Sequence, residues 1–254
     1  MNFGEILKGP LTPFKNFNIV FIALFALVVL ISFNLGDPKS ASFQIHTLVT
    51  NIFNGVVTLL FTGYCVNYFK TKYLLSDSEV NVSIDAGNFV KTGLKFYLFG
   101  LLLGIYLAVF WLPLFILGGI AFGALAAHQI AIAVIMLLVL ITVGIRLTIK
   151  LYKYALVATL RYLQTDDVKE GWNIRDINSI IKLNNKSLES YIWVAVGLSV
   201  IYITSFLFSS VFLLINKIFA SALLGILTWY STIVFYDMYG SMLDNIAIQP
   251  QEAG

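Results

Sequence analysis

The sequence predicts an all-α membrane protein, a six-span transmembrane helix bundle with three short amphipathic helices on its cytoplasmic side. Three observations lead to this fold class. Of the 254 residues, 59% are hydrophobic and only 11% are charged, whereas soluble domains carry about 25% charged residues. The apolar residues gather into runs near the length of about 20 residues that a spanning helix needs. The charged residues gather between these runs, so we expect one membrane domain over residues 1–254.

Six apolar runs are expected to cross the membrane. They cover residues 18–35, 45–69, a run from about 94 to about 120, then 129–151, 191–215 and 219–239. The helix of the fourth run has a sequence that allows it to continue to Leu163. The first run is longer than the apolar part of a signal peptide, and no small-x-small cleavage site follows it, so we expect it to stay as a span.

The connection between the third and fourth spans is predicted from its turn residues. Pro113, Gly118, Gly119 and Gly123 mark where a helix would break or turn. The stretch "GALAAHQ" is then expected to form a tight turn outside the cytoplasm, with His128 as a solvated turn residue.

The distribution of Lys and Arg predicts the orientation of the chain. With six spans, 14 of the 16 basic residues fall on one side of the membrane, and only Lys39 and Lys217 fall on the other. Cytoplasmic loops carry the excess of Lys and Arg. We therefore expect a multi-pass protein of the cell membrane with both termini in the cytoplasm.

A short amphipathic segment precedes the first, third and fifth spans. The three segments are "NFGEILKGPLTPF", "DAGNFVKTGLKF" and "NIRDINSIIKLNN", in which Ile6, Phe89 and Ile177 align. In the third, apolar residues from Trp172 to Ile181 recur at helical spacing, which is typical of a helix lying in the membrane interface. The chain is thus interpreted as three copies of a helix–span–span unit, over about 1–70, 79–163 and 170–246. The alternative is that any six-span protein with amphipathic cytoplasmic loops looks threefold.

Several of these segments resemble one known family. They are "FGEILKGPLTPFKN", "GYCVNYFKTKYL", "VSIDAGNFVKTGLKF" and "YALVATLRYLQTDDVKEGWNIRDINSIIKLNNKSLESYI". Together they are similar to a prokaryotic family of membrane proteins, common in archaea, catalogued as domain of unknown function 4013. The resemblance extends from about Phe3 to Gly240, although "EVNVSID" lacks the proline that family members often carry there. It implies a membrane location and this fold, and it implies no activity.

Ionisable groups inside spans are the usual sign of function in a membrane protein. Asp237 is the main candidate, near the cytoplasmic end of the sixth span. Arg146, Lys150 and Lys153 are expected at a similar depth on the fourth span, with Arg161 further toward the cytoplasm. A pair between Asp237 and one of them would lower the cost of a half-buried carboxylate. Such a pair would be a lock between helices, a snorkelling anchor, or a proton or substrate site.

A polar line follows the second span. Asn51, Asn54, Thr58 and Thr62 lie three or four residues apart and share one helix face. Such a line either forms hydrogen bonds between helices or borders a water path.

Enzyme chemistry is not expected. The sequence contains no phosphate-binding loop, zinc-protease, serine-hydrolase or Cys-x-x-Cys motif. Cys65 is the only cysteine and is interpreted as an apolar filler. Arg161, Asp166, Asp167 and Glu170 suggest either a phosphate or metal site or, more plainly, a solvated helix connection. We expect no cofactor, no metal and no nucleic-acid partner.

Three hypotheses about function follow. The first is a non-catalytic interaction, accessory or membrane-organising protein, which would bind the bilayer, anionic lipid headgroups or another membrane protein. Self-protection of the immunity-protein type against a peptide toxin belongs to this hypothesis. The second is a small transporter or channel with a polar path from Asn51, Asn54 and Thr58 to Asp237. The third, a lipid-modifying enzyme, would need a reactive cluster that the sequence does not show.

Overall fold

A computed structural model describes residues 16–32, 40–75, 86–213 and 216–246, and every element in these ranges is a helix. The elements are α2 (Asn16–Ser32), α3 (Ala41–Phe69), the π-helical turn η2 (Lys70–Leu74), α4 (Ala86–Ala126), α5 (Ile130–Thr165), α6 (Val168–Gly171), α7 (Ile174–Leu183), α8 (Asn185–Leu213) and α9 (Lys217–Asn245).

Four helices in the described ranges are long and apolar enough to cross a membrane. They cover Ala41–Leu74, Ala86–Ala126, Ile130–Thr165 and Ile218–Asn245. These helices support a multi-pass membrane protein, as the composition predicts. Two further helices are not among these four. They are α2, with 17 residues, and α8, from residue 185 to 213. The count of six spans and the threefold repeat stay predictions.

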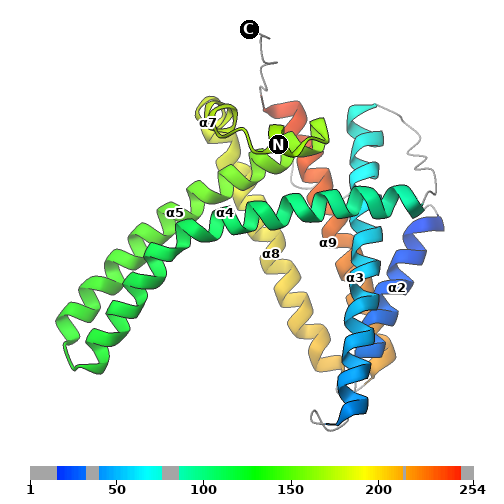
Figure 1. Cartoon of the computed structure of the whole chain (residues 1–254), viewed down its shortest axis with the longest axis horizontal. Helices are drawn as coiled ribbons and strands as arrows, with labels where there is room; N and C mark the ends of the chain where they lie inside the picture. The colour runs from blue at the N-terminus through cyan, green and yellow to red at the C-terminus, as the bar shows by residue number, and fades with distance from the viewer. Residues whose placement is uncertain (1–15, 33–39, 76–85, 214–215, 247–254) are drawn as a thin grey trace. The chain divides into compact units, whose positions relative to one another are not determined.

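The chain divides into two compact units. The first takes residues Met1–Tyr97 and Trp193–Gly254, and the second takes Leu98–Ile192. In the first unit α2 packs along α9 (Figure 1), where Gly225 brings the α9 backbone against Ile22 and Ala26 of α2. An aromatic core joins α2 to α3, with the ring centroids of Phe21 and Phe61 4.9 Å apart.

Two glycines let α3 and the first part of α4 cross backbone to backbone. A Cβ added to Gly63 would collide with the backbone of Phe89, and one added to Gly93 would collide with the backbone of Leu59. Leu59 lies four residues before Gly63 on α3, and Phe89 lies four residues before Gly93 on α4. The two close contacts are therefore one helical turn apart and belong to the same crossing. Close helix crossings in membranes characteristically need such small residues.

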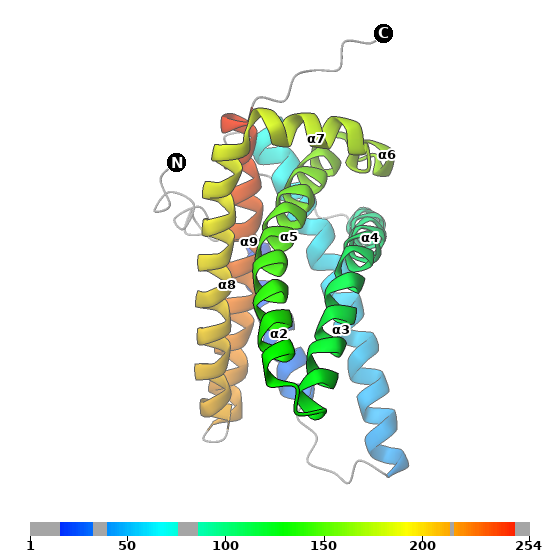
Figure 2. The same ribbon diagram turned by 90° about the vertical axis from the view of Figure 1, so that its left-hand side faces the viewer.

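In the second unit the latter part of α4 and α5 form an antiparallel hairpin (Figure 1). Its turn contains His128 with a left-handed φ of 58°. The side chain of Leu140 lies against Gly118, and that of Leu114 lies against Gly144. At the other end of α5, α6 and α7 follow in quick succession, and α7 crosses the end of α5 (Figure 2).

The structure corrects two expectations about α4. Pro113, Gly118, Gly119 and Gly123 do not break the helix, which continues from Ala86 to Ala126. Pro and Gly are tolerated inside membrane helices because neighbouring groups and small local adjustments satisfy the freed backbone. The second amphipathic segment is also not a separate helix, because α4 begins at Ala86 and runs on into the span. The first such segment, around Ile6, lies outside the described residues.

The third amphipathic segment is a helix of its own. This helix, α7, begins at Ile174. The expectation that Trp172 belongs to it is wrong, because Trp172 is the C-cap residue of α6. The apolar residues Ile177 and Ile180 of α7 are buried. Within the second unit α7 contacts α5, so this apolar face packs on protein and is not free to enter lipid.

Candidate functional site

The most polar part of the described chain lies where α5 ends and α8 begins. We call residues 166–184, which contain α6 and α7, the α6–α7 cap. Its start is fixed by two aspartates. Asp166 ends α5 in the left-handed conformation, with φ 56°, and its backbone N–H donates to the Tyr162 carbonyl at 2.8 Å. Asp167 caps α6 by accepting a 2.8 Å hydrogen bond from the backbone N–H of Lys169.

The beginning of α7 is also fixed by a side chain. Asn173 accepts a 3.3 Å hydrogen bond from the backbone N–H of Asp176, as a helix N-cap residue does. Ser179 in the next turn donates to the Asp176 carbonyl at 2.7 Å. Local capping therefore explains why the chain turns twice within a few residues and forms two short helices.

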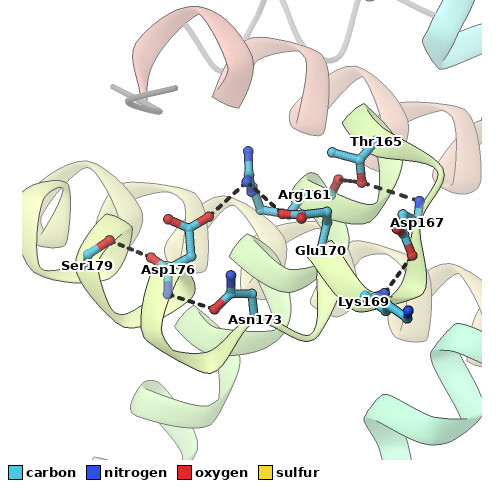
Figure 3. A network of polar contacts seen from close by, with 8 residues as sticks. All are labelled: Arg161, Thr165, Asp167, Lys169, Glu170, Asn173, Asp176 and Ser179. Carbon is cyan, nitrogen blue, oxygen red and sulfur yellow. Dashed lines mark hydrogen bonds and ion pairs between the residues drawn. The ribbon is translucent and has the colours of Figure 1, made fainter. Parts of the chain in front are cut away.

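Arg161 holds the two helices of the cap together. Its Nη2 lies 3.1 Å from Glu170 Oε2 on α6 and 2.8 Å from Asp176 Oδ2 on α7 (Figure 3). The Arg161 side chain is only 11% exposed. A planar guanidinium is suited to bridging two carboxylates. Removing it would leave two acids partly buried without their cation, a change that typically costs about 3–5 kcal/mol when a buried pair is broken.

Aromatic rings of α4 and α5 pack against the cap. Phe99 of α4 stacks on Tyr162 of α5, with centroids 4.5 Å apart. The ring of Phe99 also covers Gly171, where an added Cβ would come within 2.8 Å of it. Tyr106 meets Trp172 edge to face at 5.2 Å. The cap therefore lies on a packed aromatic layer at the end of the hairpin.

A second buried cation fixes the start of α8. Lys153 Nζ on α5 lies 2.7 Å from Glu189 Oε1 and donates to Asn185 Oδ1 at 2.6 Å. The hydrogen bond from Lys153, together with its charge, lowers the pKa of the Glu189 carboxyl. Three acids of this region therefore form ion pairs within the protein. Glu170 and Asp176 pair with Arg161, and Glu189 pairs with Lys153.

The outer face of α7 is cationic. Arg175 and Lys182 are exposed and seven residues apart, so they share one face of the helix. Exposed Asn178 and Ser179 lie between them. Ile174 and Leu183, 42% and 64% exposed, lie at the two margins of this face. Within the described part of the chain, Arg175 and Lys182 have no carboxylate within 4 Å. This outer surface of α7, with exposed Lys186 in the first turn of α8, is called the cationic face.

A separate polar cluster lies in the first unit, around Asp237 of α9. Its Oδ1 accepts from Tyr68 at 3.1 Å and from Tyr73 at 2.6 Å, and Lys72 Nζ lies 2.8 Å away. The Asp237 side chain is 3% exposed and the Lys72 side chain 26%. Asp237 Oδ2 is buried and has no hydrogen-bond partner among the described residues.

The structure corrects the expected partner of Asp237. The cation beside it is Lys72 of η2, whereas Lys153 and Arg161 have carboxylates of their own in the second unit. Arg146 and Lys150 are exposed on α5. The sequence does not indicate this pairing because Lys72 lies beyond the second apolar run, whereas η2 continues α3 and places Lys72 beside Asp237 of α9.

Three residues of the polar line of α3, Asn51, Asn54 and Thr58, do not reach Asp237, whereas half-buried Thr62 lies six residues before Tyr68. Asn51, Asn54 and Thr58 are exposed, and the one described hydrogen bond among them runs from Thr58 Oγ1 to Asn54 Oδ1 at 3.5 Å. Asn54 precedes Tyr68 by 14 residues, which corresponds to roughly 21 Å along the helix. The exposed part of the polar line is therefore separate from the buried carboxylate.

Neither cluster has the make-up of a metal site. Among the described residues, no three His, Cys, Asp or Glu side chains gather where they would hold a metal ion. In the cap, Asp167 is engaged as a helix cap, and Glu170 and Asp176 are engaged with Arg161. The exposed charged residues of the cap are Asp167, Lys169, Arg175 and Lys182.

The long apolar helices and the charged cap at the end of one helix hairpin define an integral membrane protein with several spans. Residues 47–216 match the model of a family described as "Protein of unknown function (DUF4013)", and the chain belongs to that family. The match is shorter than the resemblance from Phe3 to Gly240 expected from the sequence. It includes the whole cap and leaves Asp237 outside. No curated protein and no solved structure matches the chain.

Proposed function

We propose that the protein is a non-catalytic membrane protein that binds anionic lipid headgroups through the cationic face. The observation that supports it most is the division of charge in and beside the cap. Three acids, Glu170, Asp176 and Glu189, lie against the buried cations Arg161 and Lys153. The exposed cations of α7 and of the first turn of α8 are left to act outward.

The place of the cationic face supports lipid as the ligand. Two residues separate α5 from α6, and one residue separates α7 from α8. These short connections keep the cap between the start of α8 and the end of α5, which is a candidate for a membrane span. Lys and Arg attract anionic lipid by about 1 kcal/mol each when they lie at a cytoplasmic membrane surface. Ile174 and Leu183 at the margins of the face add apolar contact at the same level.

This proposal places the protein among accessory or membrane-organising proteins. An exposed cationic face on a fixed helix would concentrate anionic lipid beside the protein or hold it in a membrane region rich in such lipid. In this proposal the cap binds lipid and catalyses no reaction. Contacts with other membrane components would be made by α2, α3 and α9.

The test compares lipid retention by matched variants. The protein is extracted in mild detergent from membranes containing phosphatidylglycerol and phosphatidylcholine, and bound lipid is counted by native mass spectrometry. The wild-type protein should retain phosphatidylglycerol, and Arg175→Gln/Lys182→Gln/Lys186→Gln should lower its affinity on the order of 100-fold.

A charge-conserving variant is the control. Arg175→Lys/Lys182→Arg/Lys186→Arg should retain phosphatidylglycerol like the wild type, and phosphatidylcholine binding should be equal in all three proteins. Equal retention of phosphatidylglycerol by the triple glutamine variant would refute the proposal.

A further inference from the structure

The first half of α3 exposes two faces of opposite character. Its apolar face is formed by side chains that are between 48% and 62% exposed, namely Ile45, Leu48, Val49, Ile52 and Val56. Its polar face is formed by exposed Gln44, Thr47, Asn51, Asn54 and Thr58. At 100° per residue the two sets lie on different sides of the helix, and the side with Val57 and Phe61 faces the core of the first unit.

No single solvent suits both faces. In lipid the amides of the polar face would lose their hydrogen bonds with water, at a cost of about 1–3 kcal/mol for each polar group left without a partner. In water the apolar face would be exposed over several turns. α3 is one of the helices long and apolar enough to span the membrane. We therefore take lipid as the surroundings of the apolar face, which leaves the polar face to be covered.

The amides of the polar face have unused hydrogen-bonding capacity. Asn54 Oδ1 accepts from Thr58 in a long hydrogen bond, and its Nδ2 group has no acceptor among the described residues. Asn51 makes no hydrogen bond through its side chain within the same ranges. Each amide is neutral, with two N–H donors and a carbonyl oxygen that can accept two hydrogen bonds, so this face lacks charge and offers donors and acceptors equally.

We propose that a second copy of this chain covers the polar face of α3, with Asn51 and Asn54 of the two copies hydrogen-bonded across a twofold axis. A twofold interface must be complementary to itself, and a neutral amide is, because its donors fit the acceptor of an identical group. A cationic or anionic partner would find no opposite charge on this face. The axis lies along the membrane normal, so the two α3 helices run parallel.

The backbone beside the amides leaves room for a second helix. Gly55 follows Asn54, and a Cβ added to it would meet nothing within 4 Å. This differs from Gly63 and Gly93, whose missing side chains are used by the crossing of α3 and α4. Asn51, Asn54 and Thr58 also keep the three- and four-residue spacing with which parallel helices pack. The proposal is independent of lipid binding by the cap, because it concerns another unit of the chain.

Disulfide crosslinking in native membranes tests the interface. Cys65 is fully buried and is first replaced by alanine. Asn54→Cys is then compared with Ile52→Cys, a control at nearly the same depth on the apolar face. Under mild oxidation, Asn54→Cys should form a covalent dimer at least about ten times more than Ile52→Cys, because a disulfide needs Cα atoms about 4.4–6.8 Å apart.

Two further measurements decide the remaining outcomes. By light scattering in detergent, the Asn51→Leu/Asn54→Leu variant should be a monomer, whereas Ile52→Leu should stay a dimer like the wild type. The interface would be refuted if Asn54→Cys did not crosslink. Labelling of that cysteine by a membrane-impermeant maleimide would then assign the face to a water path, and protection from the label would assign it to another part of the chain.

Discussion

Lys72 Nζ lies 2.8 Å from Asp237 Oδ1, and the two residues join the end of α3 to α9 inside the first unit. The contact depends on η2, because this π-helical turn carries both Lys72 and Tyr73, which also donates to Asp237. Asp237 is almost fully buried, whereas Lys72 is partly exposed. The two partners should therefore respond differently when one of them is removed.

Lys72→Met should destabilise the protein more than Asp237→Asn. Loss of Lys72 leaves a buried carboxylate without its cation, which typically costs about 3–5 kcal/mol. Loss of the Asp237 charge leaves a lysine whose flexible side chain can turn its ammonium group toward water. Thermal unfolding of both variants and of the double variant in detergent measures the difference. An equal loss in the two single variants would contradict the buried position of Asp237.

Gly63→Ala should destabilise the crossing of α3 and α4 by about 1–3 kcal/mol, as overpacking does. The new Cβ would collide with the backbone of Phe89, which cannot turn away as a side chain can. Gly100→Ala in α4 is the control, since its Cβ meets nothing within 4 Å and alanine favours a helix by up to about 1 kcal/mol. Melting temperatures of the two variants should move in opposite directions, and a stabilised Gly63→Ala protein would rule out the close crossing.

Arg161→Leu should loosen the cap, because Glu170 and Asp176 would both lose their cation. We expect a loss of about 3–5 kcal/mol, reduced to the extent that water reaches Glu170. Arg161→Lys should lie between this variant and the wild type, since an ammonium group lacks the planar fork. Arg146→Leu removes an exposed cation from the same helix and should change stability by less than about 0.5 kcal/mol. Limited proteolysis at the cap and thermal unfolding check these values.

The Lys153–Glu189 pair predicts an acid-sensitive contact between α5 and α8. Because the folded state lowers the pKa of Glu189, the pair stabilises the folded protein above the ordinary carboxyl pKa, about 4.3. This stabilisation is lost as the pH falls through the lowered value. Glu189→Gln should therefore lower the melting temperature at pH 7 and leave it nearly unchanged at the acid end. A constant difference between the two proteins from pH 7 to the acid end would contradict the pairing.

The sequence predicted the helices better than their contacts. Apolar length was enough to place α3, α5 and α9, because lipid demands long apolar runs whatever the neighbouring helices are. The helical spacing of apolar residues, and not their number, predicted the short helix around Ile177. The use of turn residues to end helices failed at Pro113, because a membrane helix tolerates a residue that ends helices in water.

The candidate site was predicted only in part. Arg161 and Asp237 were recognised because charge is rare in apolar helices. Their partners depend on the path of the chain, since Asp176 reaches Arg161 only after two capped turns and Lys72 reaches Asp237 only because η2 extends α3. A buried lysine such as Lys153 requires an acid nearby, and that signal could have pointed to Glu189 at the start of α8.

The placement of the cap at the cytoplasmic surface is tested most directly by labelling the two ends of α5. The cap and the turn before α5 are separated by its 36 residues, which is roughly 54 Å along the helix. In a Cys65→Ala background, a membrane-impermeant maleimide should label Asn178→Cys only in inside-out vesicles and Ala127→Cys only in right-side-out vesicles. Labelling of both cysteines from the same side, or of Asn178→Cys from outside alone, would contradict a cytoplasmic lipid-binding cap.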